Sequence, residues 1–408
     1  MESLIYLVHR IPYPPNKGDK IRSFHLLRHL ASRYRVFLGC FVDQAEDLAY
    51  MSELARYCQA SCVLPIPPRL ARIKSLTGLA RGEALSLPYY RAAAMRRWVE
   101  TTVAEHGIAR AVVFSAVMAQ YLDRLPALHA VIDYCDVDSA KWSQYAADHA
   151  WPRSWIYRRE GQRLLAFERE VAARSQACVF ATEAEAQLFA GLAPEAADKL
   201  HAIDNGVDTT YFAPAVNRAS PYAPGEQVIV FTGAMDYWPN IDAVSWFARN
   251  VLPRLAERHP AVRFVIVGMN PAPAVLELAR DPRITVTGKV ADVRPYVQHA
   301  RVVVAPLRVA RGIQNKVLEA MAMARPVVVS AACAEGLHGH AGVEFAVAAT
   351  ADDYLARVNK LLEPYRAEAM GLRARARILA DRDWERNLAR FDALLESDSF
   401  SGERAHAL

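Results

Sequence analysis

The chain has 408 residues, of which 53% are hydrophobic and 23% are charged, and its formal net charge is +5. A single core rarely grows to this length, so two domains are expected, and so weak a charge does not indicate nucleic-acid binding. No apolar run approaches the roughly 18 residues of a membrane span. The six cysteines form no Cys-x-x-Cys pair, and the chain starts without the basic and apolar regions of a signal peptide. We therefore expect a cytoplasmic protein with reduced thiols and without a metal or other cofactor.

The first half of the chain alternates short apolar runs with stretches of helical periodicity. Ser3–Val8 is a nearly continuous apolar run, as in a strand buried on both faces, and Lys20–Ser32 has apolar residues at helical spacing. Such alternation is typical of a doubly wound parallel α/β sheet. Further strands are expected at Arg35–Phe41, Ala111–Phe114, Ala130–Asp133 and Ala177–Ala181, with a long helix at Ser154–Arg174.

A second series of the same kind follows the polar, proline-rich segment Phe212–Glu226, which has the composition of a linker. Its predicted strands are Gln227–Thr232, Arg263–Val267, Ile284–Val286, Arg301–Ala305 and Pro326–Ser330. Its predicted helices are Asp242–Arg258, Ala272–Arg280, Val290–His299, Gln314–Ala324, Asp352–Leu362 and Arg366–Ala380, followed by Trp384–Glu396. In sheets of this kind ligands bind beyond the carboxyl ends of the strands, so the loops at those ends decide function.

Two loops of the first half carry candidate site residues. After the first strand, Gly18 permits close approach of the backbone to a ligand and Asp19 could either cap the helix or bind a substrate. This loop lacks Gly-x-Gly-x-x-Gly, which counts against a dinucleotide. After Ala130–Asp133 come three carboxylates, Asp133, Asp136 and Asp138, which could accept a proton or bind sugar hydroxyls. The alternative is that one of them caps a helix at Ser139 and the others face water.

In the second half, the loop after Gln227–Thr232 begins with Gly233, where the absence of a side chain leaves room for a ligand. A helix with an apolar side begins just beyond the strand Arg301–Ala305 and carries Lys316 and Glu319. One interpretation is a surface helix with an i,i+3 ion pair. The other is a helix N-terminus that binds phosphate, with Lys316 and Arg308 adding charge and Glu319 binding a diol.

Three segments match a known pattern. They are Asn205–Asp208 with Phe212 and Pro214, Lys316–Ala322 with Arg325–Val328, and the final helix from Trp384. With them the chain resembles, over nearly its whole length, the retaining family 4 of the glycosyltransferases, also called group 1. The Gly233–Asn240 loop and Asp136–Ser139 resemble, more narrowly, an exopolysaccharide subgroup associated with exosortase (PEP-CTERM) sorting systems.

The resemblance implies the GT-B fold, an α/β architecture of two Rossmann-like, doubly wound parallel-sheet domains facing across a cleft. It implies an acceptor-binding domain over residues 1–205, a donor-binding domain over 206–380, and over 381–408 a helix that crosses back to the first domain, plus a tail. The expected activity is transfer of a hexose-type sugar from a nucleotide-diphosphate donor to a glycan or lipid-linked acceptor. The expected setting is bacterial exopolysaccharide or cell-surface polysaccharide synthesis.

By the pattern of the family, Lys316 neutralises the pyrophosphate, Glu319 holds the ribose and Gly18 lies near the donor phosphates. Two departures stand out: Arg311 replaces a common Glu, and Ala234 and Met235 replace a common basic pair. Arg308 or Arg311 could supply the missing positive charge. The predicted catalytic residues are Asp133, Asp136, Lys316 and Glu319. The predicted donor-binding residues are Gly18, Gly233, Met235, Arg308, Arg311, Gly312, Gln314, Asn315, Lys316 and Glu319, and the acceptor-binding residues are Asp19, Asp136 and Asp138.

A helix dipole and fixed cations can stabilise a leaving diphosphate without a metal, so we expect metal-independent activity, with retention if the family pattern holds. Two alternatives stay open: a nucleotide-sugar epimerase of the same fold, which needs no acceptor, and a non-catalytic sugar-binding protein.

The segment Pro67–Trp98 carries seven Lys or Arg against one acid, Glu83. Apolar residues recur among these bases at helical spacing, so the segment could dock on an anionic bilayer, making the protein peripheral on the inner face of the plasma membrane. The alternative is a solvated basic helix over the core.

Overall fold

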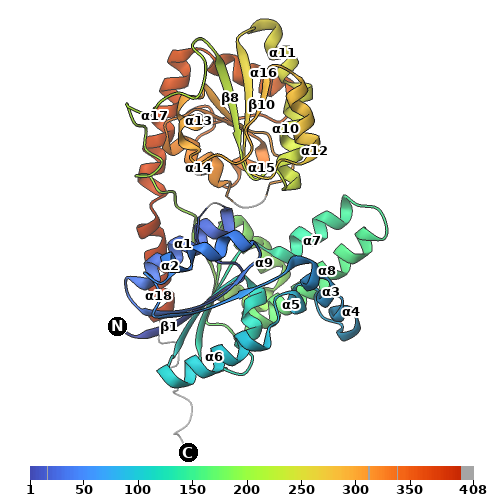
Figure 1. Cartoon of the computed structure of the whole chain (residues 1–408), viewed down its shortest axis with the longest axis vertical. Helices are drawn as coiled ribbons and strands as arrows, with labels where there is room; N and C mark the ends of the chain where they lie inside the picture. The colour runs from blue at the N-terminus through green and yellow to red at the C-terminus, as the bar shows by residue number, and fades with distance from the viewer. Residues whose placement is uncertain (16, 311–312, 338, 397–408) are drawn as a thin grey trace, which may run out of the picture. The chain divides into compact units, whose positions relative to one another are not determined.

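The computed structural model describes residues 1–15, 17–310, 313–337 and 339–396, and it divides into two compact units. Unit 1 comprises Met1–Asp204 together with the C-terminal helix from Glu385, and unit 2 comprises Asn205–Trp384. Each unit is built on one parallel sheet with helices on its faces (Figure 1). The predicted fold class, two doubly wound α/β domains, is confirmed.

The sheet of unit 1 has seven parallel strands within the described residues, in the order β3-β2-β1-β4-β5-β6-β7. Its interior strand β1, the predicted Ser3–Val8, is buried along almost its whole length because both of its faces are covered. Sequence reasoning missed the two outer strands: β3, whose six residues are exposed or only partly buried, and β7, which has three partly buried residues. The strands are β1 (Ser3–Val8), β2 (Arg35–Val42), β3 (Ala60–Pro65), β4 (Arg110–Phe114), β5 (His129–Cys135), β6 (Ala177–Phe180) and β7 (Leu200–Ala202).

The helices of unit 1 connect these strands and cover the two faces of the sheet. The α-helices are α1 (Gly18–Ala31), α2 (Met51–Leu54), α3 (Pro68–Ser75), α4 (Thr77–Arg81), α5 (Ser86–Tyr89), α6 (Ala93–His106), α7 (Asp138–Ala147), α8 (Arg153–Arg174) and α9 (Glu183–Leu192). Short 3₁₀ helices occur at η1 (Ala45–Tyr50), η2 (Ala116–Tyr121) and η3 (Pro194–Lys199).

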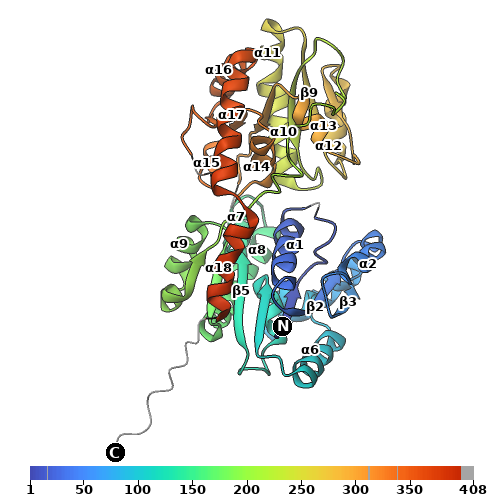
Figure 2. The same ribbon diagram turned by 90° about the vertical axis from the view of Figure 1, so that its left-hand side faces the viewer.

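The last helix, α18 (Trp384–Glu396), packs within unit 1 beside α1 (Figure 2). Its Asp392 accepts a hydrogen bond of 2.9 Å from His29 of α1, and His129 at the start of β5 contacts the carbonyl oxygen of Leu394 at 2.8 Å. The chain thus returns to its first sheet at its C-terminal end. None of the helices in the described ranges combines the length and the apolar character that crossing a bilayer requires.

The sheet of unit 2 has six parallel strands within the described residues, in the order β10-β9-β8-β11-β12-β13. Its central strand β8 is the predicted Gln227–Thr232, and the two-residue edge strand β13 was not predicted. The strands are β8 (Gln227–Thr232), β9 (Val262–Val267), β10 (Ile284–Val286), β11 (Val302–Ala305), β12 (Val327–Val329) and β13 (Ala346–Val347).

The predicted helix Asp242–Arg258 is two helices, α10 and α11, in the structure, with Pro253 in the first turn of α11. Proline fits a first turn but interrupts a helix interior, because it lacks the N–H group. The helices of unit 2 are α10 (Trp238–Asn250), α11 (Leu252–Arg258), α12 (Pro273–Leu276), η4 (Glu277–Arg280), α13 (Arg294–His299), α14 (Asn315–Ala322), α15 (Ala331–Ala334), α16 (Ala351–Leu361) and α17 (Pro364–Asp381).

Counted from one edge, the first four strands of each sheet have the order 3-2-1-4, which creates a topological switch point between strands 1 and 4. The connection after the first strand leads to one side and the connection after the fourth strand leads to the other, so a crevice forms beyond their carboxyl ends. In unit 1 this point lies between β1 and β4, and in unit 2 it lies between β8 and β11. Candidate site residues are therefore sought at these two places.

Candidate active site

The carboxyl end of β8 in unit 2 is built around two glycines. The backbone N–H of Gly233 donates to the carbonyl oxygen of Val267 at 3.0 Å. A Cβ atom on Gly268 would lie 1.6 Å from the carbonyl oxygen of Gly233, so that position accepts only glycine without a backbone shift. A Cβ atom on Gly233 would in turn lie 2.8 Å from Nδ2 of Asn240 and 3.0 Å from Nζ of Lys316. The predicted Gly233 thus faces two polar side chains.

Helix α14 brings Lys316 to this strand end. Its Val317, Leu318 and Met321 are almost fully buried in the core of unit 2, which orients the helix. The ammonium group of Lys316 then donates a hydrogen bond of 2.6 Å to Oδ1 of Asn240 on α10 and lies 4.3 Å from the centre of the Phe231 ring on β8. The structure therefore brings Lys316 close to Gly233, and both residues are predicted to bind the donor.

Sequence reasoning missed Asn240 as part of this cluster. Its side chain is nearly buried and also donates to the carbonyl oxygen of Ala234 at 2.8 Å, so it braces the loop and holds the lysine. The available signal was an amide residue in the first turn of the helix that follows the Gly233 loop.

Lys316 and Glu319 lie three residues apart on one side of α14. Burial lowers the pKa of Lys316 to about 8 and raises the pKa of Glu319 to about 7. No hydrogen bond or ion pair within 4 Å joins the two side chains, so the alternative interpretation, an i,i+3 ion pair, does not hold. Within the described ranges the Glu319 carboxylate has no hydrogen-bonding side chain, which leaves its oxygens available to a ligand.

The N-terminus of α14 adds to the positive potential at this place. Gln314 is its N-cap residue and makes no side-chain capping hydrogen bond, while Asn315 accepts a hydrogen bond of 3.3 Å from Asn205. The first N–H groups of a helix have no partner within the helix, and the helix dipole is positive at this end. An anion beside Gly233 and Lys316 would meet these groups.

Other predicted donor residues have different surroundings. Arg308 is largely exposed and forms a two-pronged ion pair with Asp242, 2.8 Å from Nε to Oδ2. Met235 is fully buried, and its backbone N–H donates to the carbonyl oxygen of Met269 at 2.8 Å, so its side chain belongs to the core. Arg311 and Gly312 lie outside the described residues.

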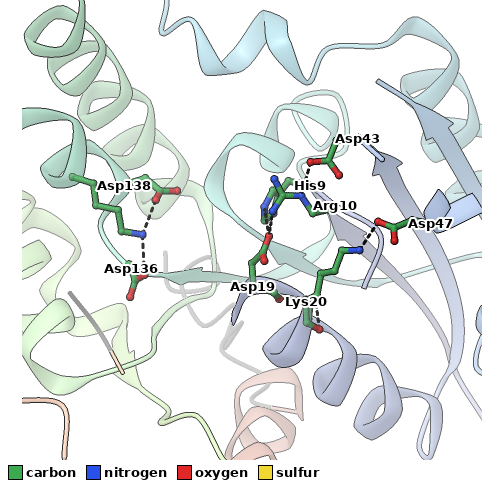
Figure 3. A network of polar contacts seen from close by, with 10 residues as sticks. His9, Arg10, Asp19, Lys20, Asp43, Asp47, Asp136 and Asp138 are labelled. Carbon is green, nitrogen blue, oxygen red and sulfur yellow. Dashed lines mark hydrogen bonds and ion pairs between the residues drawn. The ribbon is translucent and has the colours of Figure 1, made fainter. Parts of the chain in front are cut away.

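In unit 1, α1 starts at Gly18 and has Lys17 at its N-cap, so capping by Asp19 is wrong. Asp19 accepts a hydrogen bond of 2.5 Å from Arg10 and lies 3.4 Å from Nε2 of His9 (Figure 3). Arg10 also lies 3.1 Å from Asp43, which follows β2. Burial alone would raise the pKa of Asp19, but the hydrogen bond to His9 and the charge of Arg10 hold it well below its ordinary value.

Sequence reasoning missed His9, Arg10 and Asp43. Each follows the carboxyl end of a strand, β1 or β2, so their positions directly after apolar runs were the signal. They form a polar network with Asp19 at the switch point of unit 1.

The three carboxylates after β5 divide into two groups. Asp133 is fully buried and pairs with Arg22 of α1 at 2.7 Å, so its carboxylate belongs to the core of unit 1. Asp136 and Asp138 instead both contact Lys141, at 2.8 and 3.1 Å (Figure 3). Helix α7 begins at Asp138 with Val137 at its N-cap, so capping at Ser139 is wrong.

Asp136 and Asp138 are not arranged as metal ligands, because both carboxylates contact the ammonium group of Lys141. Burial alone would lower the pKa of Lys141, but Asp136 and Asp138 outweigh it and raise that pKa well above its ordinary value. Across residues 1–15, 17–310, 313–337 and 339–396, no three His, Cys, Asp or Glu side chains cluster as metal ligands would.

Part of unit 2 is similar in sequence to a known protein family. Residues 226–364 match the family model described as Glycosyl transferases group 1. This range includes Gly233, Asn240, Lys316 and Glu319. A search of curated protein sequences finds none that matches the chain.

Three solved structures are similar over nearly the whole chain. HepE from Anabaena in complex with UDP is 16% identical, with 97% of this chain and 100% of that chain covered and a TM-score of 0.68. Sucrose-phosphate synthase from Thermosynechococcus elongatus is 15% identical, with coverages of 96% and 98% and a TM-score of 0.71. WaaG, a glycosyltransferase involved in lipopolysaccharide biosynthesis, is 15% identical, with coverages of 97% and 100% and a TM-score of 0.64. The two parallel-sheet units thus have the GT-B architecture of glycosyltransferase structures.

Proposed function

We propose that this protein is a retaining, metal-independent glycosyltransferase. It transfers a sugar from a nucleoside-diphosphate donor to a hydroxyl of a glycan or lipid-linked acceptor, in the synthesis of exopolysaccharide or another bacterial cell-surface polysaccharide. The observation that carries the proposal is the approach of Lys316 to Gly233 at the switch point of unit 2, with Glu319 one turn further along α14, inside the range that matches the glycosyltransferase model. The polysaccharide setting is supported by the sequence resemblance and by the likeness to WaaG.

In this proposal the donor diphosphate binds at the start of α14. The free N–H groups of the helix, with Gln314 and Asn315 nearby, and the ammonium group of Lys316 neutralise its charge. Gly233 lacks the Cβ atom that would crowd Asn240 and Lys316, so both side chains can lie against this strand end. One turn further on, the Glu319 carboxylate accepts hydrogen bonds from the two hydroxyls of the nucleotide ribose.

The reaction breaks the bond between the anomeric carbon and the diphosphate oxygen, and the electron pair leaves with the diphosphate. The acceptor oxygen forms the new bond to the anomeric carbon from the same face, and its proton passes to the departing diphosphate. Because the leaving group takes the proton, no side-chain base of high pKa is required. Lys316 stabilises the negative charge as it develops on the diphosphate.

The acceptor binds mainly to unit 1 in this proposal. Asp19 on α1, and Asp136 and Asp138 after β5, are its candidate ligands, because carboxylates accept hydrogen bonds from sugar hydroxyls. Asp138 is the most exposed of the three, at 41% of its side chain. Asp133 receives no role in the chemistry because Arg22 occupies it in the core.

A thermal-shift screen with UDP, GDP, dTDP and ADP tests donor binding. A ligand at about 100 times its Kd stabilises the folded state by about 2.7 kcal/mol, so the cognate nucleotide should raise Tm by several degrees. The Lys316→Met variant should lose most of this shift. Incubation with the matching nucleotide sugar alone, and then with an acceptor, separates transfer from epimerisation. The proposal would be contradicted if none of the four nucleotides raised the Tm of the protein.

A further inference from the structure

Helix α3 in unit 1 buries small side chains and exposes large apolar ones. Ala71 and Ser75 are nearly buried, whereas 65% of Leu70 and 66% of Ile73 are exposed. Leu76 and Leu79, in the following turn and in α4, are 55% and 41% exposed. A helix that packs only against its own domain places its large apolar residues inward. These residues therefore face outward for a reason other than the stability of unit 1.

A second exposed apolar group lies at the turn between α7 and α8. Trp151 is 80% exposed, Trp155 is 51% exposed and Ile156 is 36% exposed. Tryptophan is a large apolar side chain with one polar atom, and it is favoured where one side of a surface is apolar and the other is wet.

Hydrogen bonds hold the two groups together as one surface. Arg159, which lies one helical turn after Trp155 on the same side of α8, donates to the carbonyl oxygens of Gly78 and Glu83 at 3.0 and 3.1 Å. Glu160 accepts from the backbone N–H groups of Leu85 and Ser86. Helices α3, α4 and the first turns of α8 lie next to one another (Figure 1). We call residues 68–81 and 151–158 the basic apolar face.

The charge of this face has one sign. Residues 67–82 contain four Lys or Arg and no acid, and residues 149–159 contain three Arg and no acid. The exposed basic residues are Arg69, Arg72, Lys74, Arg81, Arg153 and Arg158.

The sequence-based membrane hypothesis extended further, to Trp98, and that part is not supported. Arg91 forms a two-pronged pair with Glu83, at 2.8 Å for each contact, and Arg96 donates to the carbonyl oxygen of Gln120 at 3.0 Å. Tyr90 and Trp98 are partly buried against the core of unit 1. The face therefore ends before α5, and it gains the tryptophans that sequence reasoning did not include.

The combination of apolar and basic side chains indicates which kind of partner can bind to the basic apolar face. A second copy of the chain would bring six exposed basic residues against the same six, and like charges at close range repel. A nucleic acid would satisfy the charge, but the branched side chains of Leu70 and Ile73 do not stack on bases as aromatic rings do. An anionic bilayer satisfies both properties, because apolar side chains enter the acyl boundary while Lys and Arg contact the headgroups.

We propose that unit 1 docks on an anionic lipid bilayer through the basic apolar face. Leu70, Ile73 and Leu76 enter the interface, Trp151 and Trp155 anchor at the headgroup level, and the surrounding arginines bind lipid phosphates. This docking does not depend on the proposed transferase activity, because none of these residues belongs to the donor or acceptor sites.

Flotation of the full chain with vesicles tests the proposal. The protein should float with vesicles of phosphatidylcholine and phosphatidylglycerol at low salt, and stay in the dense fraction with phosphatidylcholine alone. The double variant Leu70→Ser and Ile73→Ser should partition at least about tenfold more weakly. The matched control is Leu372→Ser with Leu379→Ser, two residues of α17 that are 58% and 51% exposed, and it should partition as the unchanged protein does.

A second pair of variants separates charge from apolar contact. The substitutions Arg69→Gln and Arg72→Gln should each weaken partitioning onto the vesicles about fivefold. The control Arg280→Gln, at an exposed position, should not change the partitioning. The proposal would be overturned if all variants floated to the same extent, or if flotation were the same with and without anionic lipid in the vesicles. Sedimentation could also show that the protein self-associates and that only the Leu70 and Ile73 substitutions abolish this. That result would overturn the proposal as well, because the face would then bind a second copy of the chain. Thermal shifts with nucleotides on the same variants report separately on the donor site.

Discussion

The Lys316 ammonium group donates a 2.6 Å hydrogen bond to the side-chain oxygen of Asn240, which joins helix α14 to helix α10 beyond the end of β8. The contact holds a partly buried cation in place before any ligand is present. In the proposed function this arrangement is preorganised for the leaving diphosphate, because the charge need not move as the bond breaks. It also carries a cost in stability, since burial disfavours the charged form of the lysine.

Lys316→Ala should lower kcat/KM about 10²- to 10³-fold, as loss of one preorganised charge or donor does in other enzymes. Steady-state kinetics with the cognate donor measures the effect. Lys360→Ala, at an exposed position of α16, is the matched control and should leave the kinetics unchanged. Unaltered turnover in the Lys316 variant would remove the lysine from the proposed site.

Donor affinity should decrease above pH 8. The folded protein releases the Lys316 proton with a pKa of about 8, so a more alkaline solution removes the charge that binds the diphosphate. Calorimetric titration of the nucleotide across this range measures the dependence. In Lys316→Arg the guanidinium stays charged, so the affinity profile should be flat over the same pH values. A wild-type profile as flat as that of the variant would contradict the assignment.

Glu319→Gln should stabilise the protein at pH 8 while abolishing donor binding. The pKa of Glu319 is about 7 in the folded chain against 4.5 ordinarily, so between these values the folded state holds a proton that the unfolded state has lost. Stability from this group therefore falls as pH rises from 4.5 to 7, and the full cost of the buried charge is present above 7. Gln avoids that cost, so Tm should rise by about 2–4 °C at pH 8 and hardly change at pH 4.5. Equal shifts at both pH values would count against this cause.

Gly268→Ala should destabilise unit 2 and weaken donor binding together, because its methyl group would push the carbonyl oxygen of Gly233 out of place. Gly191→Ala, inside α9 with nothing within 4 Å of the added Cβ, is the control. Alanine is a better helix former, so the control should gain up to about 1 kcal/mol. Thermal unfolding and nucleotide titration of both variants check the pair, and a Gly268 variant as stable as the control would refute the steric argument.

Turnover should survive an excess of EDTA. The helix start and Lys316 together provide positive charge for the diphosphate, so the proposed chemistry does not route through a metal. Assays with EDTA, with and without added Mg²⁺ or Mn²⁺, measure this. Loss of activity that added metal restores would show instead that a cation completes the donor site.

The buried strands could be read from the sequence alone. Ser3–Val8 and Gln227–Thr232 occur as predicted, because continuous apolar runs of this length mark strands covered on both faces. Ile284–Val286 also occurs as predicted, although it is an edge strand in which Thr285 is exposed. The edge strands β3 and β13 were missed because the sequence signal for a strand, a continuous apolar run, is absent there. The six residues of β3 are exposed or only partly buried, and β13 has only two residues, so neither strand carries a long apolar run.

The site divides in a similar way. The sequence by itself determined which loops end strands, and thereby pointed to Gly233, Lys316 and Glu319, since strand ends and helix starts are local features. Only the tertiary structure decided what each side chain meets. Asp133 pairs with Arg22 across 111 residues, Met235 turns into the core, and Lys316 finds Asn240 across 76. Such partners follow from how the whole chain packs, because burial and pairing energies depend on neighbours in space and no local periodicity records them.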